Sequence, residues 1–255
     1  MTASAVPLAL VTGGLHRVGA HISAQLARAG YRLALHGRSE GDADARLRDA
    51  LAETGIEHAQ FYADLADPSE VTVLSDDIVA HFGCAPTLLV NNASLFEQGD
   101  WRAADPEAMT RNMQVNGLAP IALARAVAKA ATHSKGSAAI VNILDQRVAM
   151  PVPDQFAYTI AKQALWQATR TMAVAFAPQV RVNAVAPGPT LPTEDYDDEQ
   201  WRRIGVMLPL ERHPSPDAIA EAVLYLARAE HVTGQTLFVD GGASLKGWDR
   251  DFIYL

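Results

Sequence analysis

The chain has 255 residues, of which 49% are hydrophobic and 20% charged, which is enough for the core of one large α/β domain spanning residues 1–255. Its formal net charge of -8 disfavours binding to a phosphate backbone, so nucleic acid is excluded as an expected partner. The single cysteine excludes an intramolecular disulfide, and we find neither a signal peptide nor a run of about 18 apolar residues, so we expect a cytoplasmic protein.

Short β-like runs alternate with helical patterns along the whole chain. Strands are predicted at residues 8–12, 31–36, 59–65, 87–94, 137–144, 180–187 and 234–242. Helices are predicted at residues 17–29, 43–53, 68–82, 106–132, 155–176 and 216–229, with an irregular stretch after residue 187. This alternation predicts a seven-stranded parallel sheet with helices on both faces. Ligands of such sheets bind outside the carboxyl ends of the strands, so Gly13, Asn91, Asp145 and Pro187 should meet in one crevice.

The turn after the first strand reads TGGLHRVG, from Thr12 to Gly19, and leads into a helix. A phosphate loop for a dinucleotide requires this strand–turn–helix context. Gly13 permits the tight turn, and Gly19 lets the helix pack close to the sheet. Backbone N–H groups at the start of the helix can then hold a pyrophosphate.

The second strand ends in LHGRS, residues 35–39. A site that prefers NAD usually places a carboxylate at this strand end, against the ribose 2′-hydroxyl. Arg38 instead offers a permanently charged, planar group that suits a 2′-phosphate. The alternative is a solvent-exposed loop arginine, and the nearby Glu40 weakens the phosphate interpretation. The residues favour NADPH.

Further motifs follow in a fixed order: ADL at 63–65, NNAS at 91–94, Asn116, YTIAK at 158–162 and PG at 187–188. Together with the glycine loop, they resemble the short-chain dehydrogenase/reductase family over nearly the whole chain. The resemblance implies a Rossmann-type, doubly wound fold and a homotetramer.

Two residues differ from those of most family members, and they indicate a subgroup of the family. Arg17 stands where most members have a third glycine, and Asp145 stands where the family has its catalytic serine. With LHGRS and the sequence NNASLF at 91–96, these residues resemble the pteridine reductases, including the dihydromonapterin reductase branch. The stretch after the second strand is one residue shorter than in some members of that subgroup.

The resemblance implies roles for individual residues. Those implied to bind the cofactor are Gly13, Arg17, Val18, Gly19, His36, Arg38, Ser39, Asp64, Leu65, Asn92, Ala93, Ser94, Tyr158, Lys162, Pro187 and Gly188. Those implied to bind substrate are Arg17, Ser94, Phe96, Asp145 and Tyr158. Those implied to be catalytic are Asn116, Asp145, Tyr158 and Lys162, and no metal ligand is implied.

Tyr158 and Lys162 lie four residues apart, on one face of a predicted helix. A free phenol has a pKa near 10, and a neighbouring ammonium lowers that pKa. We therefore expect Lys162 to lower the pKa of Tyr158, so that the phenol gives a proton as hydride arrives. By resemblance, Lys162 also holds the nicotinamide ribose, and Asn116 positions a relay water.

Asp145 does not suit ordinary carbonyl reduction, because an ionised carboxylate repels a developing oxyanion. It suits a C=N substrate that must be protonated, or an acid kept neutral by burial. The alternative is a structural ion pair with Arg17 or Arg147. Phe96 is implied to stack on the pterin, or else packs in the core. Ser94 meets the pterin or the cofactor, or is a plain turn residue.

Residues 189–214 are polar and marked by prolines, which is typical of a substrate lid. The C-terminal tail, residues 244–255, carries Trp248, Phe252 and Tyr254, and we expect this apolar tail to pack on a neighbouring subunit.

The sequence thus favours an NADPH-dependent reductase of a dihydropterin C=N bond. One alternative is a carbonyl reductase of another small substrate, such as a 3-oxoacyl compound or a sugar ketone. The other is an NADPH-binding regulator without activity, which is expected to lack Tyr158 or Lys162, although both are present.

Overall fold

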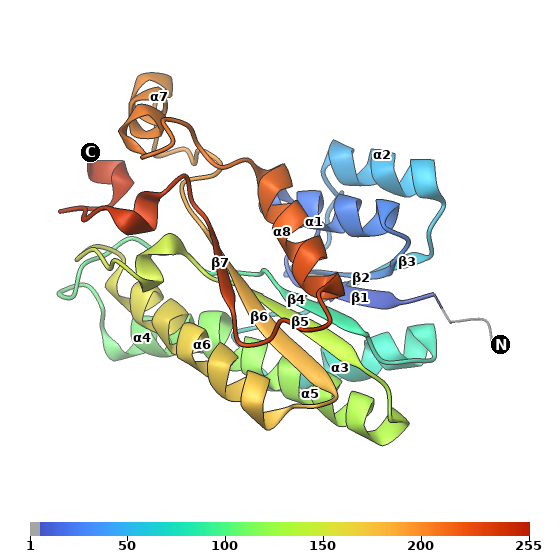
Figure 1. The fold of residues 1–255 in the computed structure, drawn as a ribbon. Coiled ribbons are helices and arrows are strands. Elements are labelled where there is room, and N and C mark those ends of the chain that lie inside the picture. Colours follow the sequence, from blue (N-terminus) through green and yellow to red (C-terminus); the bar gives the residue numbers. More distant parts are fainter. Residues whose placement is uncertain (1–5) are drawn as a thin grey trace.

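A seven-stranded parallel sheet forms the middle layer of the computed structural model, which describes residues 6–255 (Figure 1). Its order is β3-β2-β1-β4-β5-β6-β7, so the direction of winding reverses between β1 and β4. The predicted doubly wound α/β fold is confirmed. The strands are β1 (Leu8–Val11), β2 (Arg32–Gly37), β3 (His58–Tyr62), β4 (Leu88–Asn91), β5 (Ala138–Ile143), β6 (Val180–Pro187) and β7 (Thr236–Val239).

The ends of the chain differ in what the structure describes. Residues 1–5, part of the stretch in which we expect no signal peptide, lie outside the described residues. Within residues 6–255, none of the helices is long and apolar enough to cross a membrane.

The burial of the strands explains their composition. β1, β4 and β5 are buried along their whole length, which requires the continuous apolar runs LALV, LLVN and AAIVNI. β3 lies at the edge of the sheet and is only partly covered. The central strands therefore present few polar side chains until their carboxyl ends.

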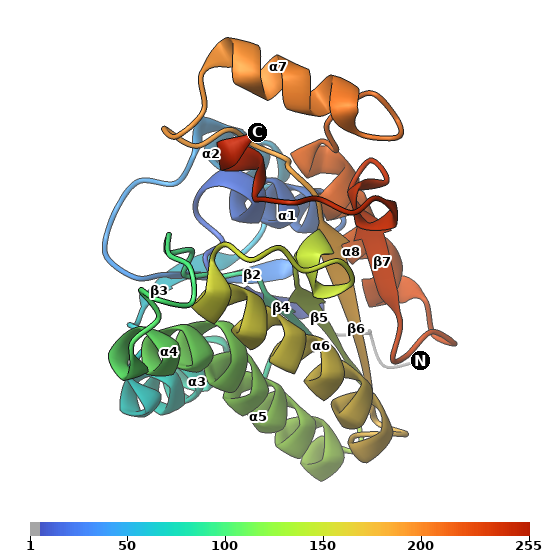
Figure 2. The same ribbon diagram turned by 90° about the vertical axis from the view of Figure 1, so that its left-hand side faces the viewer.

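Helices cover both faces of the sheet (Figures 1 and 2). One layer contains α1 (Arg17–Arg28), α2 (Ala45–Thr54) and α8 (Pro216–Arg228). The other contains α3 (Pro68–Phe82), α4 (Pro106–Met113), α5 (Ala119–Ser134) and α6 (Phe156–Ala175). Each layer packs its apolar stripe on the sheet, so that an apolar cluster lies on each face.

The helix predicted over residues 106–132 is interrupted. A π-helical turn, η1 (Gln114–Leu118), separates α4 from α5. Pro120 has no N–H to donate to the carbonyl of Asn116, four residues earlier, so a regular α-helix cannot continue there. The sequence pattern marks the apolar stripe but not this local change of winding.

The stretch predicted to be irregular after residue 187 contains a helix, α7 (Asp198–Met207). Asp197 caps it by accepting a hydrogen bond from the backbone N–H of Gln200 at 2.7 Å. Asp198 and Glu199 lie in its first turn, where negative charge is favourable. Figure 1 places α7 and the C-terminus beyond the carboxyl ends of the strands.

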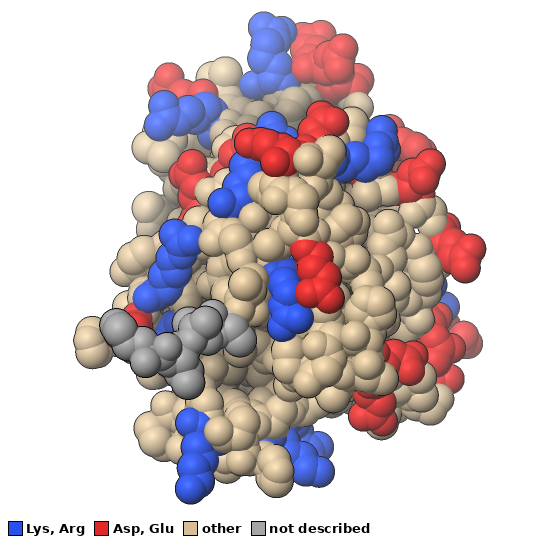
Figure 3. All heavy atoms as spheres, turned by 90° about the vertical axis from the view of Figure 1, so that its right-hand side faces the viewer, with Lys and Arg blue, Asp and Glu red and all other residues tan. Residues whose placement is uncertain are grey.

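Three short helical turns complete the chain: η2 (Gln146–Val148), η3 (Ala243–Leu245) and η4 (Phe252–Tyr254). The surface is mixed in charge. On the face shown in Figure 3, acidic and basic side chains are interspersed with uncharged areas.

Candidate active site

A cavity of about 520 Å³ opens at the carboxyl ends of the strands. Its walls come from segments far apart in the sequence, as expected at the point where the strand order reverses. The predicted site residues that line it are Gly13, Arg17, Val18, Gly19, His36, Arg38, Asn92, Ala93, Ser94, Phe96, Asp145, Tyr158, Lys162, Pro187 and Gly188.

Five predicted residues do not line the cavity. Ser39, Asp64 and Leu65 lie outside its walls, and Asn116 is fully buried behind them. Asn91 was expected in the crevice, but its amide points into the protein and donates to the side chain of Asn142 at 2.8 Å. A residue at the end of a strand lies at the ligand-binding edge of the sheet. The alternation of side chains along the strand then decides whether its side chain faces the ligand or the protein interior.

The glycine loop is tightly constrained by its own backbone. Gly13 has a φ of +59°, in the left-handed region that favours glycine. A Cβ added to Gly19 would lie 1.9 Å from the carbonyl oxygen of Gly13, so no side chain fits there. The amide of Asn92 donates to the same carbonyl at 3.0 Å and to that of Thr12 at 2.9 Å. The loop and the end of β4 are thus fixed to each other.

His36 supports the loop from beneath. Its Nδ1 accepts a hydrogen bond from the backbone N–H of Gly13 at 3.1 Å, and its Nε2 donates to the carbonyl of Ala63 at 3.0 Å. Burial lowers the pKa of His36, in keeping with this neutral tautomer. Both ring nitrogens are used within the chain, so His36 positions the glycine loop.

Arg17 spans two segments. Its backbone has a φ of 52° and its N–H donates to the carboxylate of Asp44 at 2.7 Å. Its guanidinium donates to the carbonyl of Pro192 at 3.3 Å, in the segment predicted to be a lid. Asp44, which also contacts Nδ1 of His16 at 3.0 Å, was missed by the sequence analysis, since no motif connects it to the loop.

Asp145 and Tyr158 form a hydrogen-bonded pair. Asp145 follows β5, Tyr158 lies in the first turns of α6, and the phenol donates to Oδ2 of Asp145 at 3.1 Å. Burial raises the pKa of Tyr158 well above 10, and the charge of Asp145 raises it further. Tyr158 therefore holds its proton at neutral pH.

Lys162 donates its hydrogen bond to the backbone and not to the Tyr158 hydroxyl. Its ammonium donates to the backbone carbonyl of Ile143 at 2.9 Å and lies 5.7 Å from the centre of the Tyr158 ring. Burial lowers the pKa of Lys162 itself to about 8. The expectation that Lys162 lowers the pKa of Tyr158 is wrong in this structure, because burial and Asp145 dominate.

Arg147 is the cation that contacts the pair. Its backbone N–H and its Nε donate to Oδ1 of Asp145 at 2.9 and 3.0 Å. Its side chain is 5% exposed and lies 5.3 Å from the ring centres of both Phe96 and Tyr158. Burial lowers the pKa of Arg147, but nearby carboxylates outweigh this and raise it. Asp145 thus pairs with Arg147, and with no group of Arg17.

Both oxygens of the Asp145 carboxylate accept hydrogen bonds, and neither donates one. Oδ1 accepts from Arg147 twice and Oδ2 accepts from Tyr158, an arrangement that an ionised carboxylate satisfies. From the sequence, Arg147 was expected only as a structural partner of Asp145, although its position two residues after Asp145 was a usable signal.

Phe96 faces the cavity. It is 40% exposed, so the alternative of a core-packed ring is wrong. Its ring meets Tyr158 edge to face, with ring centres 4.9 Å apart. Asn116 holds this segment: its Oδ1 accepts from the hydroxyl of Ser94 at 2.9 Å, and its amide donates to the carbonyl of Leu95 at 2.8 Å.

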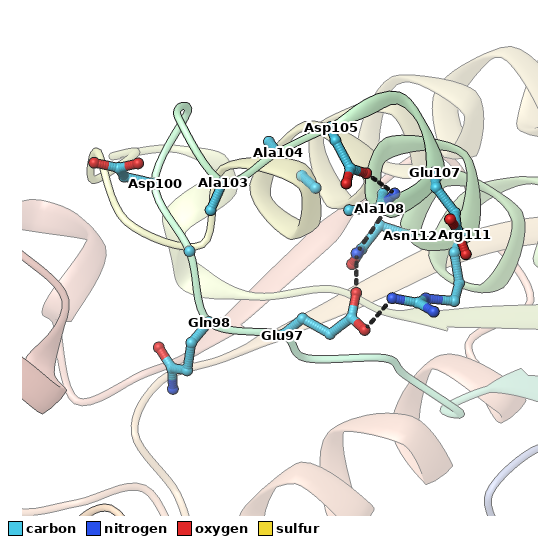
Figure 4. A pocket seen from close by; sticks show the side chains of 12 residues that line it. Glu97, Gln98, Asp100, Ala103, Ala104, Asp105, Glu107, Ala108, Arg111 and Asn112 are labelled. Atoms are coloured by element: carbon cyan, nitrogen blue, oxygen red, sulfur yellow. Dashed lines mark hydrogen bonds and ion pairs between the residues drawn. The ribbon is translucent and has the colours of Figure 1, made fainter.

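A second cavity, of about 350 Å³, lies on the other side of this segment. Figure 4 shows Glu97 between Asn112 and Arg111 of α4, to which it is bonded at 2.8 Å in each case. Asp105 caps α4 by accepting from the N–H of Ala108 at 2.8 Å. The charged groups drawn with dashed lines are thus used to fix α4, which leads into the turn that carries Asn116.

The predicted lid forms the outer wall of the first cavity. Tyr196 and Trp201 line it, and Trp201 stacks on His213 with ring centres 3.8 Å apart. Both ring nitrogens of His213 contact carbonyls, of Pro189 at 2.9 Å and of Trp201 at 2.7 Å. This ring therefore joins the start of the segment to α7.

Part of the C-terminal tail packs on its own chain, and packing of the tail on a neighbouring subunit stays a prediction. Phe252 is 4% exposed and clusters with Ile204 of α7, with Leu208 directly after that helix, and with Ala243. It also lines the cavity. The unpredicted helix α7 thus provides an apolar surface for Phe252.

Comparison with known proteins agrees with this geometry. Residues 14–244 match the family model described as enoyl-(acyl carrier protein) reductase. The chain belongs to the short-chain dehydrogenase/reductase family of oxidoreductases.

Several relatives match almost the full chain. The FolM alternative dihydrofolate reductase 1 of Brucella suis, solved in complex with NADP, is 37% identical, with a TM-score of 0.87 over 96% of this chain and 97% of that one. The granaticin polyketide synthase putative ketoacyl reductase 2 of Streptomyces violaceoruber is 33% identical over 94% of this chain and 96% of its own. Pteridine reductase 1 of Leishmania tarentolae is 30% identical over 96% of this chain and 98% of its own. The resemblance to pteridine reductases is confirmed.

Proposed function

We propose that this oxidoreductase uses NADPH to reduce a C=N bond of a dihydropterin. The observation that carries the proposal is the pair of Asp145 and Tyr158, joined at 3.1 Å beside the ring of Phe96. A carboxylate next to the proton donor distinguishes this site from one that reduces carbonyls.

The glycine loop fits a dinucleotide. Gly13 and Gly19 line the cavity at the start of α1, where backbone N–H groups can hold a pyrophosphate. Arg38 lines the cavity and supplies the charge for a 2′-phosphate. The two Brucella FolM relatives, each 37% identical, are complexes with NADP. When bound, the nicotinamide supplies a hydride.

The substrate end suits a flat ring. Its walls include the aromatic side chains of Phe96, Tyr158, Tyr196, Trp201 and Phe252. Aromatic faces and edges favour contact with a planar heterocycle over a flexible acyl chain. The FolM alternative dihydrofolate reductase and the pteridine reductase, both similar to this chain, are named for substrates with such rings.

The charge of Asp145 favours nitrogen over oxygen at the reacting bond. Reduction of C=O leaves negative charge on oxygen, which a carboxylate opposes. Reduction of C=N adds hydride to carbon and a proton to nitrogen, and the resulting N–H donates to a carboxylate.

We assign delivery of that proton to the pair as a unit: the Tyr158 hydroxyl, which is hydrogen-bonded to the Asp145 carboxylate, holds the proton and gives it to nitrogen. The pair is left with one more negative charge and regains its proton from solvent.

Asn116 contributes by position, since it holds Ser94 and Leu95 beside the substrate wall. The segment 189–214 is proposed as the lid, with Arg17 linking it to the glycine loop through Pro192. A cytoplasmic location and a homotetramer remain predictions.

NADPH oxidation with dihydromonapterin, dihydrobiopterin, dihydrofolate and acetoacetyl substrates tests the proposal. We expect turnover of at least one pterin, and Asp145→Asn should lower its kcat/KM roughly 10²-fold, the scale of one positioned acid–base group. Melting temperature on the same preparations separates loss of chemistry from loss of folding. Turnover of the acetoacetyl substrate alone, or normal pterin kinetics in a folded Asp145→Asn enzyme, would contradict the proposed function.

A further inference from the structure

Arg147 joins the proton-donating pair to the far end of the chain. Besides Asp145, its guanidinium donates to Asp251 Oδ2 at 2.6 Å and to Gln155 Oε1 at 3.0 Å. Asp251 belongs to the C-terminal tail, 104 residues away in sequence. One cation is therefore shared between a carboxylate of the active site and a carboxylate of the tail.

The pair of Arg147 and Asp251 is deeply buried, with side chains 5% and 3% exposed. A buried ion pair gives little net stability, because removing both charges from water offsets their attraction. Well-packed apolar residues would close the same space at less cost. This makes a purely structural reason for the pair a weak one.

Asp251 is held in place before any substrate binds. Its backbone N–H donates to Asp154 at 2.8 Å, and its Oδ1 accepts from the N–H of Ile253 at 3.0 Å. The guanidinium of the neighbouring Arg250 donates hydrogen bonds of 2.8 to 3.1 Å to the same Asp154 carboxylate. Only Oδ2 of Asp251 is left for Arg147, so its direction is fixed.

We propose that Asp251 is a positioning residue of the active site, which acts through Arg147 on the proton-donating pair of Asp145 and Tyr158. This inference rests on the proposed function. By drawing the guanidinium toward the tail, Asp251 keeps Arg147 from fully neutralising Asp145, whose carboxylate then remains a strong acceptor for the Tyr158 hydroxyl. Arg147 also lies over both rings, where it offsets the charge left on the pair after proton delivery.

The tail is therefore part of the active site. Phe252, the next residue, lines the substrate cavity and packs on α7 of the proposed lid. Displacement of the tail would remove an aromatic wall and the partner of Arg147 at once.

Asp251→Asn tests the inference, because it keeps the shape of the side chain and removes its charge. Asp249→Asn is the matched control: it makes the same change two residues away on the same tail, at an exposed position. The substrate is whichever member of the pterin and acetoacetyl panel the wild-type enzyme turns over. We expect Asp251→Asn to lower kcat roughly tenfold, with the NADPH Kd and substrate KM changed less than about twofold, and Asp249→Asn to match wild type.

A double-variant cycle with Arg147→Gln shows whether the effect passes through Arg147. In the Arg147→Gln background, Asp251→Asn should lower kcat by less than about twofold further, because the ion pair through which Asp251 acts is already absent. Hydrogen exchange of the amides of residues 145–148 gives a readout independent of any substrate, and we expect faster exchange in Asp251→Asn only.

Wild-type kcat in a folded Asp251→Asn enzyme, losses that multiply in the double variant, or unchanged exchange at residues 145–148 would overturn the inference. A lower melting temperature with normal kcat would show a structural role alone and would also overturn it. An enzyme that reduces only the acetoacetyl substrate refutes the proposed function, yet the same variants still test Asp251 on that substrate.

Discussion

The two ends of the cavity are built in different ways. At the cofactor end, backbone atoms of the glycine loop approach one another and leave no room for a side chain at Gly19. At the substrate end, side chains from distant segments meet, as Arg147 and Asp251 do across 104 residues. We therefore expect the cofactor end to lose cofactor binding when a single carbon is added to the glycine loop. We expect the substrate end to lose activity when a single charge or hydroxyl is removed while the shape of the side chain is kept.

Of these changes, Gly19→Ala should have the largest effect, because it should prevent the glycine loop from binding the cofactor. The added Cβ would lie 1.9 Å from the carbonyl oxygen of Gly13, so the loop must move away from α1. We expect NADPH binding to be lost in a fluorescence titration, with unfolding easier by about 3 kcal/mol in urea, the upper range for overpacking. Gly41→Ala is the control, because nothing lies within 4 Å of its added Cβ. A Gly19→Ala enzyme that binds NADPH normally would refute the steric account.

Tyr158→Phe should break the substrate end and spare the cofactor end. The change removes the hydroxyl that donates to Asp145 at 3.1 Å, while the ring still packs against Phe96. We expect kcat to fall roughly 10²-fold or more, with the NADPH Kd within about twofold of wild type. Near-normal turnover would remove Tyr158 from the mechanism.

Lys162 lies between the two ends, and the pH dependence of stability tests its burial. Its pKa is lowered to about 8 in the folded chain, so above pH 8 the unfolded state binds more protons than the folded state, and the free energy of unfolding rises with pH. From pH 8 to pH 10 the rise from this group should be about 2 kcal/mol, given an ordinary lysine pKa near 10.4 when unfolded.

Urea unfolding of wild type and Lys162→Met at both pH values isolates this contribution. The difference in stability between the two proteins should shift in favour of wild type at pH 10. A difference independent of pH would show that the folded pKa of Lys162 is close to its ordinary value.

Arg38→Ala should have the smallest effect, a loss of the preference for NADPH over NADH. The change removes a charge at the cofactor end of the cavity and leaves the glycine loop intact. We expect NADPH to bind wild type at least about tenfold more tightly than NADH, a difference of about 1.4 kcal/mol, and Arg38→Ala to erase it. Arg28→Ala, an exposed arginine at the end of α1 paired with Glu53, serves as the control. Equal affinities for the two nucleotides in wild type would contradict this assignment.

The sheet, most of the helices and the cofactor loop could be predicted from the sequence alone, whereas α7 and the π-helical turn before α5 could not. Continuous apolar runs such as LALV and AAIVNI specify buried parallel strands, and Gly13 and Gly19 satisfy local steric rules that leave few alternatives. The order of the motifs also placed Asp145 and Tyr158 in one site, since strand ends converge in a doubly wound sheet.

The interactions among the charged and polar groups could be read only from the folded chain. The pKa of Tyr158 depends on burial and on Asp145 more than on the lysine one turn away. His36 supports the glycine loop through hydrogen bonds to Gly13 and to the carbonyl of Ala63, contacts that the sequence did not indicate, and its role toward the cofactor stays a prediction. The contact of Asp251 with Arg147 follows from the packing of the tail on α7, and no periodicity or spacing encodes a pairing across 104 residues. Desolvation and long-range contacts are properties of the assembled fold, and for that reason the local sequence pattern could not supply them.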